Sequence, residues 1–268
     1  MVKNGSVNID GTQMHYVSFG TGRKKLSILP GLSDGLATVK GKALILSAPY
    51  KRFFKDYTVF MFSRKNHLPE GCSIRQTAED QVMAFKKLGI EKTSVLGVSQ
   101  GGMIAQYIAI DHPEVMDKLI LAVTAPCAND VVSQCVTSWI AMAEKGDHVA
   151  LMVDTAGKMY SKTYLKKYRW LFPVIARLTK PRSYERFFRN AYAILGFDAR
   201  EELSKIQCPT LILAGDDDLT VGNEAVYELK DGIKGSEAYI YTGLGHAAYE
   251  EAADFYDRVY EFIERNKK

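Results

Sequence analysis

A serine flanked by glycines, at residues 97–101 (Gly-Val-Ser-Gln-Gly), constrains the fold of this chain more than any other feature. The apolar run 94–98 leads into this motif, and residues 103–107 after it favour a helix. A Gly-x-Ser-x-Gly pattern in that setting is typical of a sharp strand-to-helix turn that exposes the serine hydroxyl. Glycine is needed there because the backbone passes too close to itself for a Cβ atom. We therefore predict a strand, a strained turn at Ser99 and a helix.

Apolar strands alternate with helical segments through most of the sequence. The patterns predict short strands at residues 6–9, 14–19, 26–29, 58–62, 95–98, 118–124, 210–214 and 237–241. Helices are expected at 73–88, 100–110, 222–229 and 249–265. Near-continuous apolar strands between helices indicate an α/β fold, with a mostly parallel sheet of about eight strands and helices on both faces.

The alternation stops between residues 126 and 206, where the sequence looks helical and rich in aromatic residues. We interpret residues 1–125 and 207–268 as two parts of one α/β core. Residues 126–206 are then a helical insertion. A chain of 268 residues is long enough for one large domain with such an insertion.

Composition narrows the classes of partner. The net charge of +4 is too small to indicate nucleic acid or a membrane surface by itself. The N-terminal residues lack the apolar core of a signal peptide, and no apolar run is long enough to span a membrane. The four cysteines show no metal or redox spacing, and we interpret them as free thiols in a cytoplasmic protein.

A serine hydroxyl is a poor nucleophile at neutral pH and needs a base, usually histidine, that is oriented by a carboxylate. His246 follows the last predicted strand on a glycine-flanked loop. Open α/β sheets place their sites at the carboxyl ends of their strands, so we predict that His246 is the base. The other histidines lie in an early strand, a loop, a helix end and the insertion: His15, His67, His112 and His148.

The carboxylate should also follow a strand, and should lie between Ser99 and His246 in the sequence. Asp216, Asp217 and Asp218 come directly after the apolar run 210–214 and a glycine. For any one of them, a solvated acidic turn is the alternative interpretation. Three in a row favour at least one that points into a site, and the pattern leaves open which one.

Three features together resemble the α/β-hydrolase superfamily: residues 97–103, residues 215–218 and the pair 245–246. The resemblance is strongest to its branch of capped esterases, lactonases and carbon–carbon hydrolases, and it covers nearly the whole chain outside the insertion. It implies that Asp218 is the acid, with Asp217 as the alternative. It also implies that the backbone N–H groups of Leu32 and Gln100 form an oxyanion hole.

The chain departs from the pattern of that superfamily in two places. Residues 30–32, Pro-Gly-Leu, stand where the family usually has His-Gly-x. The backbone donors are unaffected by this change, but the usual support of the loop is missing. After the fourth strand, residues 63–73 replace an Asp-x-Arg-Gly-x-Gly-x-Ser segment, and we assign no mechanism to them.

The resemblance implies that the insertion, residues 126–206, forms a helical cap, or lid, and its sequence is aromatic and basic. Its rings indicate a pocket for apolar or aromatic groups, although any single ring could simply pack the cap onto the core. Candidate pocket residues are Ser33, Trp139, Tyr160 and Trp170. Residues 158–189 carry ten Lys or Arg and one acid, which could steer an anionic substrate or form a solvated face. Steering predicts that carboxylate-bearing esters react faster than neutral analogues and that salt removes this preference.

The motifs and the resemblance together predict a serine hydrolase for a small carboxylic ester, a lactone or a related acyl substrate. Ser99 would attack the carbonyl, His246 would take its proton, and Asp218 would orient the imidazole. This chemistry requires no metal and no organic cofactor. The same three residues could instead serve a carbon–carbon hydrolase, an acyltransferase or a lyase, and a receptor-like, nearly inactive member is a further alternative.

Overall fold

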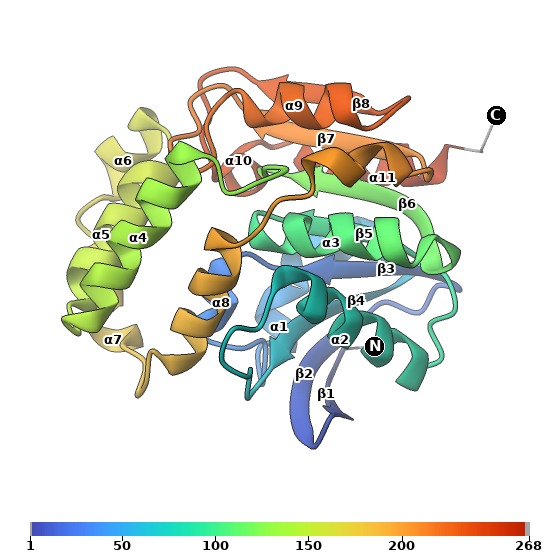
Figure 1. Ribbon diagram of the computed structural model, residues 1–268, viewed down its shortest axis with the longest axis horizontal. Helices are drawn as coiled ribbons and strands as arrows, with labels where there is room; N and C mark the ends of the chain where they lie inside the picture. The colour runs from blue at the N-terminus through green and yellow to red at the C-terminus, as the bar shows by residue number, and fades with distance from the viewer. Residues whose placement is uncertain (1, 266–268) are drawn as a thin grey trace.

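The computed structural model describes residues 2–265, and an eight-stranded sheet forms its centre. The strand order is β1-β2-β4-β3-β5-β6-β7-β8 (Figure 1). The bounds are β1 Val2–Ile9, β2 Thr12–Phe19, β3 Lys24–Leu29, β4 Tyr57–Lys65, β5 Thr93–Val98, β6 Met116–Ala122, β7 Thr210–Gly215 and β8 Glu237–Tyr241. Strand β2 pairs antiparallel with β1 and β4, whereas the remaining neighbours pair parallel. The predicted fold class is confirmed.

Successive side chains of the inner strands point to opposite faces of the sheet, and each face carries its own core. In β6, Leu119 and Leu121 belong to one core, whereas Ile120 and Ala122 belong to the other. The first core is covered by α2 (Ile74–Lys87), α3 (Gln100–Asp111) and α9 (Ala225–Gly232). The second is covered by α11 (Phe255–Glu264), α1 (Ala43–Leu46) and η2 (Ala48–Phe53).

Helix α2 illustrates how local sequence sets an element. Ser73 accepts a hydrogen bond from the Gln76 N–H at 3.1 Å, and the Gln76 side chain accepts from the Ser73 N–H at 2.8 Å. This reciprocal cap satisfies two N–H groups that a helix start leaves unpaired. The helix ends before Gly89, whose φ of +66° lies in the left-handed region.

Five helices lie between β6 and β7, and Figure 1 shows them gathered on one side of the sheet. They are α4 (Asp130–Glu144), α5 (His148–Met159), α6 (Lys162–Tyr168), α7 (Phe172–Thr179) and α8 (Glu185–Leu195). We call residues 130–195 the helical segment. Polar side chains start three of these helices, because Asn129, Asp147 and Ser161 each accept a hydrogen bond from a first-turn N–H.

The C-terminal part differs from the sequence prediction of one helix over 249–265. Two helices are present, α10 (Ala248–Glu251) and α11, because Ala252 adopts an extended backbone between them. Glu250 and Glu251 of α10 accept hydrogen bonds from Tyr160 and Ser161 of the helical segment, which keeps this short helix against it. Within residues 2–265, no helix combines the length and the apolar character needed to cross a bilayer.

Candidate active site

The strand, turn and helix predicted around Ser99 are present. Strand β5 ends at Val98, α3 begins at Gln100, and Ser99 between them has a φ of +54°. A positive φ at a non-glycine residue stores strain, and such strain clusters at functional sites. The turn depends on its glycines, because a Cβ atom on Gly101 would lie 1.8 Å from the Leu29 carbonyl oxygen.

A chain of hydrogen bonds joins Ser99, His246 and Asp218, which are far apart in the sequence. The Ser99 Oγ lies 2.9 Å from the His246 Nε2, and the His246 Nδ1 lies 2.8 Å from the Asp218 Oδ2. His246 and Asp218 are both buried. The backbone N–H groups of Thr220 and Val221 donate to the other Asp218 oxygen at 2.8 and 3.0 Å, so the carboxylate is held on both sides.

The other two aspartates of the acidic turn have different positions. Asp216 is exposed, and its side chain accepts a hydrogen bond from the Gly243 N–H at 2.6 Å. Asp217 is half-buried, and its own N–H donates to the Leu244 carbonyl. Of the three aspartates, Asp218 is therefore the one whose carboxylate contacts the imidazole.

Leu32 and Gln100 both begin helices. Leu32 is the first residue of η1 (Leu32–Gly35), and Gln100 is the first residue of α3. First-turn N–H groups have no acceptor within their own helix, and the positive end of the helix dipole favours negative charge there. The two N–H groups are thus available as donors beside Ser99.

A cavity of about 230 Å³ opens beside Ser99 and His246. The sheet side contributes Ser33 and Leu36, and the helical segment contributes Trp139 and Tyr160. The other lining side chains are mostly apolar and include Leu151, Met152, Ala156, Met159, Phe172, Phe187 and Tyr249. No lysine or arginine lines this cavity within the described part of the chain.

The expectation that Trp170 lines the pocket is wrong. Its side chain is 66% exposed, because it lies in the turn between α6 and α7 on the outer side of the helical segment. Phe172, two residues further on, lines the cavity instead. Aromatic composition alone could not separate the inner ring from the outer one.

Two cavity aromatics are fixed by hydrogen bonds. The Trp139 Nε1 donates to Asp154 at 2.8 Å, and Lys158 donates to the same carboxylate oxygen at 2.7 Å. The Tyr160 hydroxyl donates to Glu250, and burial together with this carboxylate raises the pKa of Tyr160. Glu250 also lines the cavity, which the sequence analysis did not foresee.

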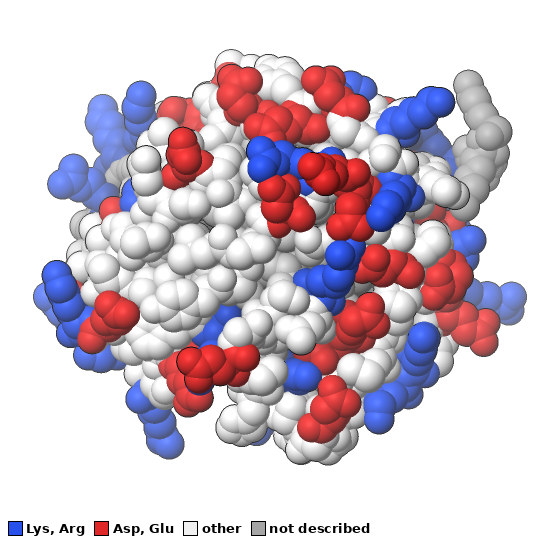
Figure 2. Space-filling view, viewed as in Figure 1, with Lys and Arg blue, Asp and Glu red and all other residues white. Residues whose placement is uncertain are grey.

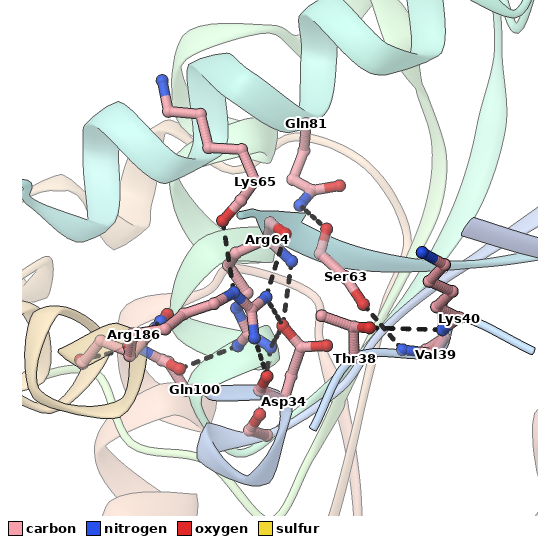
Figure 3. A network of polar contacts seen from close by, with 12 residues as sticks. Asp34, Thr38, Val39, Lys40, Ser63, Arg64, Lys65, Gln81, Gln100 and Arg186 are labelled. Atoms are coloured by element: carbon pink, nitrogen blue, oxygen red, sulfur yellow. Dashed lines mark hydrogen bonds and ion pairs between the residues drawn. The ribbon is translucent and has the colours of Figure 1, made fainter. Parts of the chain in front are cut away.

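A buried polar network contacts Gln100, the residue after Ser99 (Figure 3). Arg64 is 1% exposed and donates to the Gly31 carbonyl at 3.0 Å and to the Gln100 side chain at 2.9 Å. Asp34 faces Arg64 at 3.6 Å and also binds Arg186 of α8. Burial lowers the pKa of Arg64 to about 10, although the charge of Asp34 opposes this shift.

Asp34 remains a carboxylate in this network. Burial alone would raise its pKa, but the charges of Arg186 and Arg64 lower the pKa below its ordinary value. The contacts of Arg64 and Arg186 could not be predicted from the sequence, because no motif links positions so far apart and residues 63–73 received no role. The departures from the family pattern at residues 30–32 and 63–73 were the available signals. Among residues 2–265, no group of three or more His, Cys, Asp or Glu side chains is arranged to hold a metal ion.

Comparison with known proteins agrees with this fold. A family model described as alpha/beta hydrolase fold matches residues 43–145. RutD of Stutzerimonas stutzeri, whose name describes a carbamate hydrolase, is 23% identical over 252 residues, which cover 88% of this chain and 90% of RutD.

Two solved structures are similar along almost the entire chain. MGS-M2, an alpha/beta hydrolase enzyme from a Medee basin deep-sea metagenome library, has a TM-score of 0.87 at 18% identity and covers 98% of both chains. The enol-lactonase from Burkholderia xenovorans LB400 has a TM-score of 0.78 at 21% identity, over 97% of this chain and 100% of its own. These matches show the α/β-hydrolase fold that the motifs predict, and they support a hydrolase of that type.

Proposed function

We propose that this protein is a serine hydrolase that cleaves small, neutral carboxylic esters or lactones through an acyl-enzyme. The observation that carries the proposal is the hydrogen-bonded chain from Ser99 through His246 to Asp218, with an apolar cavity at its serine end. A nucleophile, a base that contacts it and a carboxylate that orients the base are the parts that acyl transfer requires.

In the first half of the reaction, the Ser99 Oγ attacks the carbonyl carbon while its proton passes to the His246 Nε2. Asp218 keeps the other ring nitrogen protonated and stabilises the imidazolium. The Leu32 and Gln100 N–H groups bind the oxyanion of the tetrahedral intermediate. The intermediate collapses, and the alcohol leaves with the proton that His246 held.

In the second half, a water molecule gives a proton to His246 and attacks the acyl group on Ser99. A second tetrahedral intermediate forms on the same two N–H donors and then releases the carboxylic acid. The proton returns from His246 to the serine oxygen, so the enzyme is regenerated. An oxyanion donor of this kind typically contributes about a hundredfold to a thousandfold to the rate.

The cavity supports the apolar alternative for the substrate rather than the anionic one. Its walls are mostly apolar, its fixed charge is the carboxylate of Glu250, and its described lining has no cation to pair with a substrate carboxylate. The helical segment supplies much of this wall, so we propose that residues 126–206 act as the cap. We also keep the expectation of a cytoplasmic protein as part of this proposal.

The names of the relatives are compatible with acyl chemistry on one scaffold. RutD is named for carbamate hydrolysis, and the enol-lactonase is named for lactone opening. Both names describe hydrolysis at a carbonyl carbon. Carbon–carbon hydrolysis, acyl transfer and lyase chemistry remain the competing outcomes of the test below.

The test compares wild-type protein, Ser99→Ala and Ser33→Ala on a panel of short p-nitrophenyl esters, lactones and thioesters. Ser33 also lines the cavity, so its variant is a matched loss of a hydroxyl. We expect Ser99→Ala to lose both turnover and labelling by a fluorophosphonate, whereas Ser33→Ala, which alters the cavity wall and not the nucleophile, keeps the labelling. Unchanged turnover in Ser99→Ala would overturn the covalent mechanism, and labelling of Ser99 without turnover of any panel member would favour the competing chemistries.

A further inference from the structure

The outer surface of the helical segment is strongly basic. Residues 155–184 contain eight Lys or Arg and no Asp or Glu. Lys and Arg side chains project from the margin of the molecule where Figure 1 places α5, α6 and α7 (Figure 2). Within the described chain, seven exposed cations of this stretch form no ion pair: Lys162, Lys166, Lys167, Arg169, Arg177, Lys180 and Arg182.

The same surface exposes large apolar side chains. Trp170, Val174 and Leu178 follow each other at intervals of four residues, so they share one face of α7 and the turn before it. Leu178 is 82% exposed, and Ile175 lies beside this row. The opposite face of α7 packs against α5 and buries Ala176. An exposed apolar row on a small helix is unfavourable in water unless something covers it.

These cations do not serve a substrate in the cavity, because no lysine or arginine lines that cavity in the described residues. An apolar row with Trp and Leu, surrounded by Lys and Arg, has instead the composition of an element that lies in the interface of an anionic bilayer. Phe172 and Tyr160, from the same stretch, line the cavity, so the surface adjoins the site.

We propose that residues 162–182 dock this protein onto anionic lipid surfaces. Trp170 and Leu178 enter the headgroup layer, and the surrounding Lys and Arg side chains contact the lipid phosphates. An apolar acyl compound dissolved in the bilayer would then be close to the cavity. The docking rests on the charge and exposure of the surface and does not depend on the reaction proposed above.

The test is sedimentation of the full chain with vesicles of phosphatidylcholine, with or without phosphatidylglycerol. We expect binding that requires phosphatidylglycerol and weakens with salt. Trp139 is buried and Trp170 is exposed, so a blue shift of the tryptophan fluorescence on binding reports entry of Trp170. Arg169→Glu with Arg177→Glu should lower partitioning about tenfold or more, since each cation near such a surface contributes appreciably.

The matched control is Lys86→Glu with Lys87→Glu, which makes the same change of charge at exposed positions of α2. The partition coefficient of this control on anionic vesicles should stay within about threefold of the wild-type value, because only its net charge is lower. Absence of binding to anionic vesicles at low salt, or equal losses in the two double variants, would overturn the proposal. Binding to poly(U) RNA or to an acidic protein without any binding to vesicles would also overturn it.

A different observation carries a second proposal, which rests on the proposed function. Arg64 donates to the Gly31 carbonyl, one residue before Leu32, and to the side chain of Gln100. It thereby touches both segments that supply the two candidate oxyanion donors. The first of these segments, residues 30–32, reads Pro-Gly-Leu and has no polar side chain of its own to hold it.

The surroundings of Arg64 fix its planar guanidinium in one orientation. Asp34 accepts a hydrogen bond from the Arg64 N–H at 3.0 Å and pairs with the Arg64 side chain. Arg186 closes the other side by donating to Asp34 and to the Arg64 carbonyl (Figure 3). The Gln100 side chain completes the link by donating to the Asn190 carbonyl at 2.8 Å.

We infer that Arg64 is a positioning residue, which holds the Leu32 and Gln100 N–H groups at the spacing that the oxyanion requires. Substitution should therefore weaken binding of the tetrahedral state more than binding of the substrate. Lys65 provides the control, because it is the next residue of β4 and forms its own buried ion pair, with Asp80 at 2.8 Å. The contacts of its ammonium are to aspartates rather than to residues 31 or 100.

The experiment compares Arg64→Met, Arg64→Lys and Lys65→Met. We expect Arg64→Met to lower kcat about tenfold to a hundredfold with KM changed less than about threefold, and to weaken an alkyl boronic acid by the same factor as kcat. The kcat of Arg64→Lys should lie between the values of the wild type and Arg64→Met, because an ammonium keeps the charge but cannot donate to two acceptors in the same fixed geometry as a guanidinium. Lys65→Met should lose stability without this selective loss.

The outcomes separate this proposal from the one on which it rests. If wild-type protein hydrolyses esters through Ser99 but the Arg64 and Lys65 variants lose kcat and boronic acid affinity alike, the positioning role is wrong. If wild-type protein hydrolyses no ester, the proposed function is wrong, and the positioning role of Arg64 is wrong with it. Should Arg64→Met not fold, Arg64→Lys carries the comparison alone, and wild-type kcat in that variant would overturn the inference.

Discussion

Charged side chains have opposite environments at the carboxyl ends of the strands and on the outer surface of the helical segment. At the edge, Asp218 and His246 are buried and hydrogen-bonded on both sides. On the helical segment, cations such as Arg169 and Arg177 are exposed and make no ion pair within the described residues. An unpaired buried charge is costly, so the buried side chains at the strand ends must keep their hydrogen-bonded arrangement. The exposed cations of the outer surface are free to contact a partner.

The largest effect is expected at the carboxylate of the edge. Asp218→Asn keeps the shape of the side chain but should stabilise the wrong imidazole tautomer, so kcat should fall about a thousandfold to ten-thousandfold. Asp217→Asn is the matched control in the same turn and should stay within about threefold of wild type, as expected for a residue that does not contact His246. Steady-state hydrolysis of a p-nitrophenyl ester measures both variants. If Asp217→Asn caused the larger loss, the assignment of the acid would be wrong.

The two regions also differ in the space around their glycine residues. Gly101→Ala puts a Cβ atom 1.8 Å from the Leu29 carbonyl oxygen, so we expect a loss of about 3 kcal/mol or more in the free energy of unfolding. Gly157 is exposed in α5 with open space around its Cβ position. Gly157→Ala should therefore stabilise the protein by about 0.5–1 kcal/mol. Urea unfolding of both variants would contradict the comparison if their effects had the same sign.

The inner face of the helical segment should control the length of the acyl group. Ala156→Leu adds volume at a cavity wall, so kcat/KM for a hexanoate ester should fall about tenfold relative to that for an acetate ester. Ala141→Leu makes the same change at an exposed position of α4 and should leave the ratio unchanged. A ratio that is unaltered in Ala156→Leu would show that the acyl group binds elsewhere.

The smallest effect concerns a buried histidine of the helical segment. Burial lowers the pKa of His148, with a further contribution from Lys180, and both of its ring nitrogens lack a partner among residues 2–265. Below the ordinary pKa of 6.5, the unfolded chain binds a proton that the folded protein does not. The free energy of unfolding should thus decrease as the pH falls from 6.5 to the lower, folded-state pKa of His148.

His148→Phe keeps a ring beside Tyr184 and removes the titration. Its urea midpoint should therefore depend less steeply on pH than that of the wild type over this range. Identical pH dependence in the two proteins would contradict the role assigned to His148. The comparison of slopes, rather than of absolute midpoints, removes the contribution of the other titrating groups.

Most strands, helices and turns of this protein can be predicted from short-range sequence patterns. Apolar runs predict all eight strands, the Ser-x-x-Gln box predicts α2, and the glycines predict the turn at Ser99, because each signal lies within a few residues. The break between α10 and α11 escaped prediction, since it depends on contacts of Glu250 and Glu251 with the helical segment. Local propensity carries no information on such contacts.

Long-range pairing limited the prediction of the site as well. The roles of Ser99, His246 and Asp218 were predicted from motifs and resemblance, and these residues lie together in the structure. Arg64, Asp34 and Arg186 follow no known spacing, and a buried arginine has no signature in a single sequence. The prediction that Trp170 lines the pocket was wrong because composition does not distinguish the inner face of a helical insertion from its outer face.

Mass spectrometry of a trapped intermediate would show directly whether Ser99 is the nucleophile. Wild-type protein is mixed with a slowly hydrolysed p-nitrophenyl ester, quenched in acid during turnover and digested. The account predicts that the mass of one acyl group is found on the peptide that contains Ser99, and that Ser99→Ala carries none. Steady turnover with no acyl group on Ser99, or with the acyl group on another residue, would contradict it.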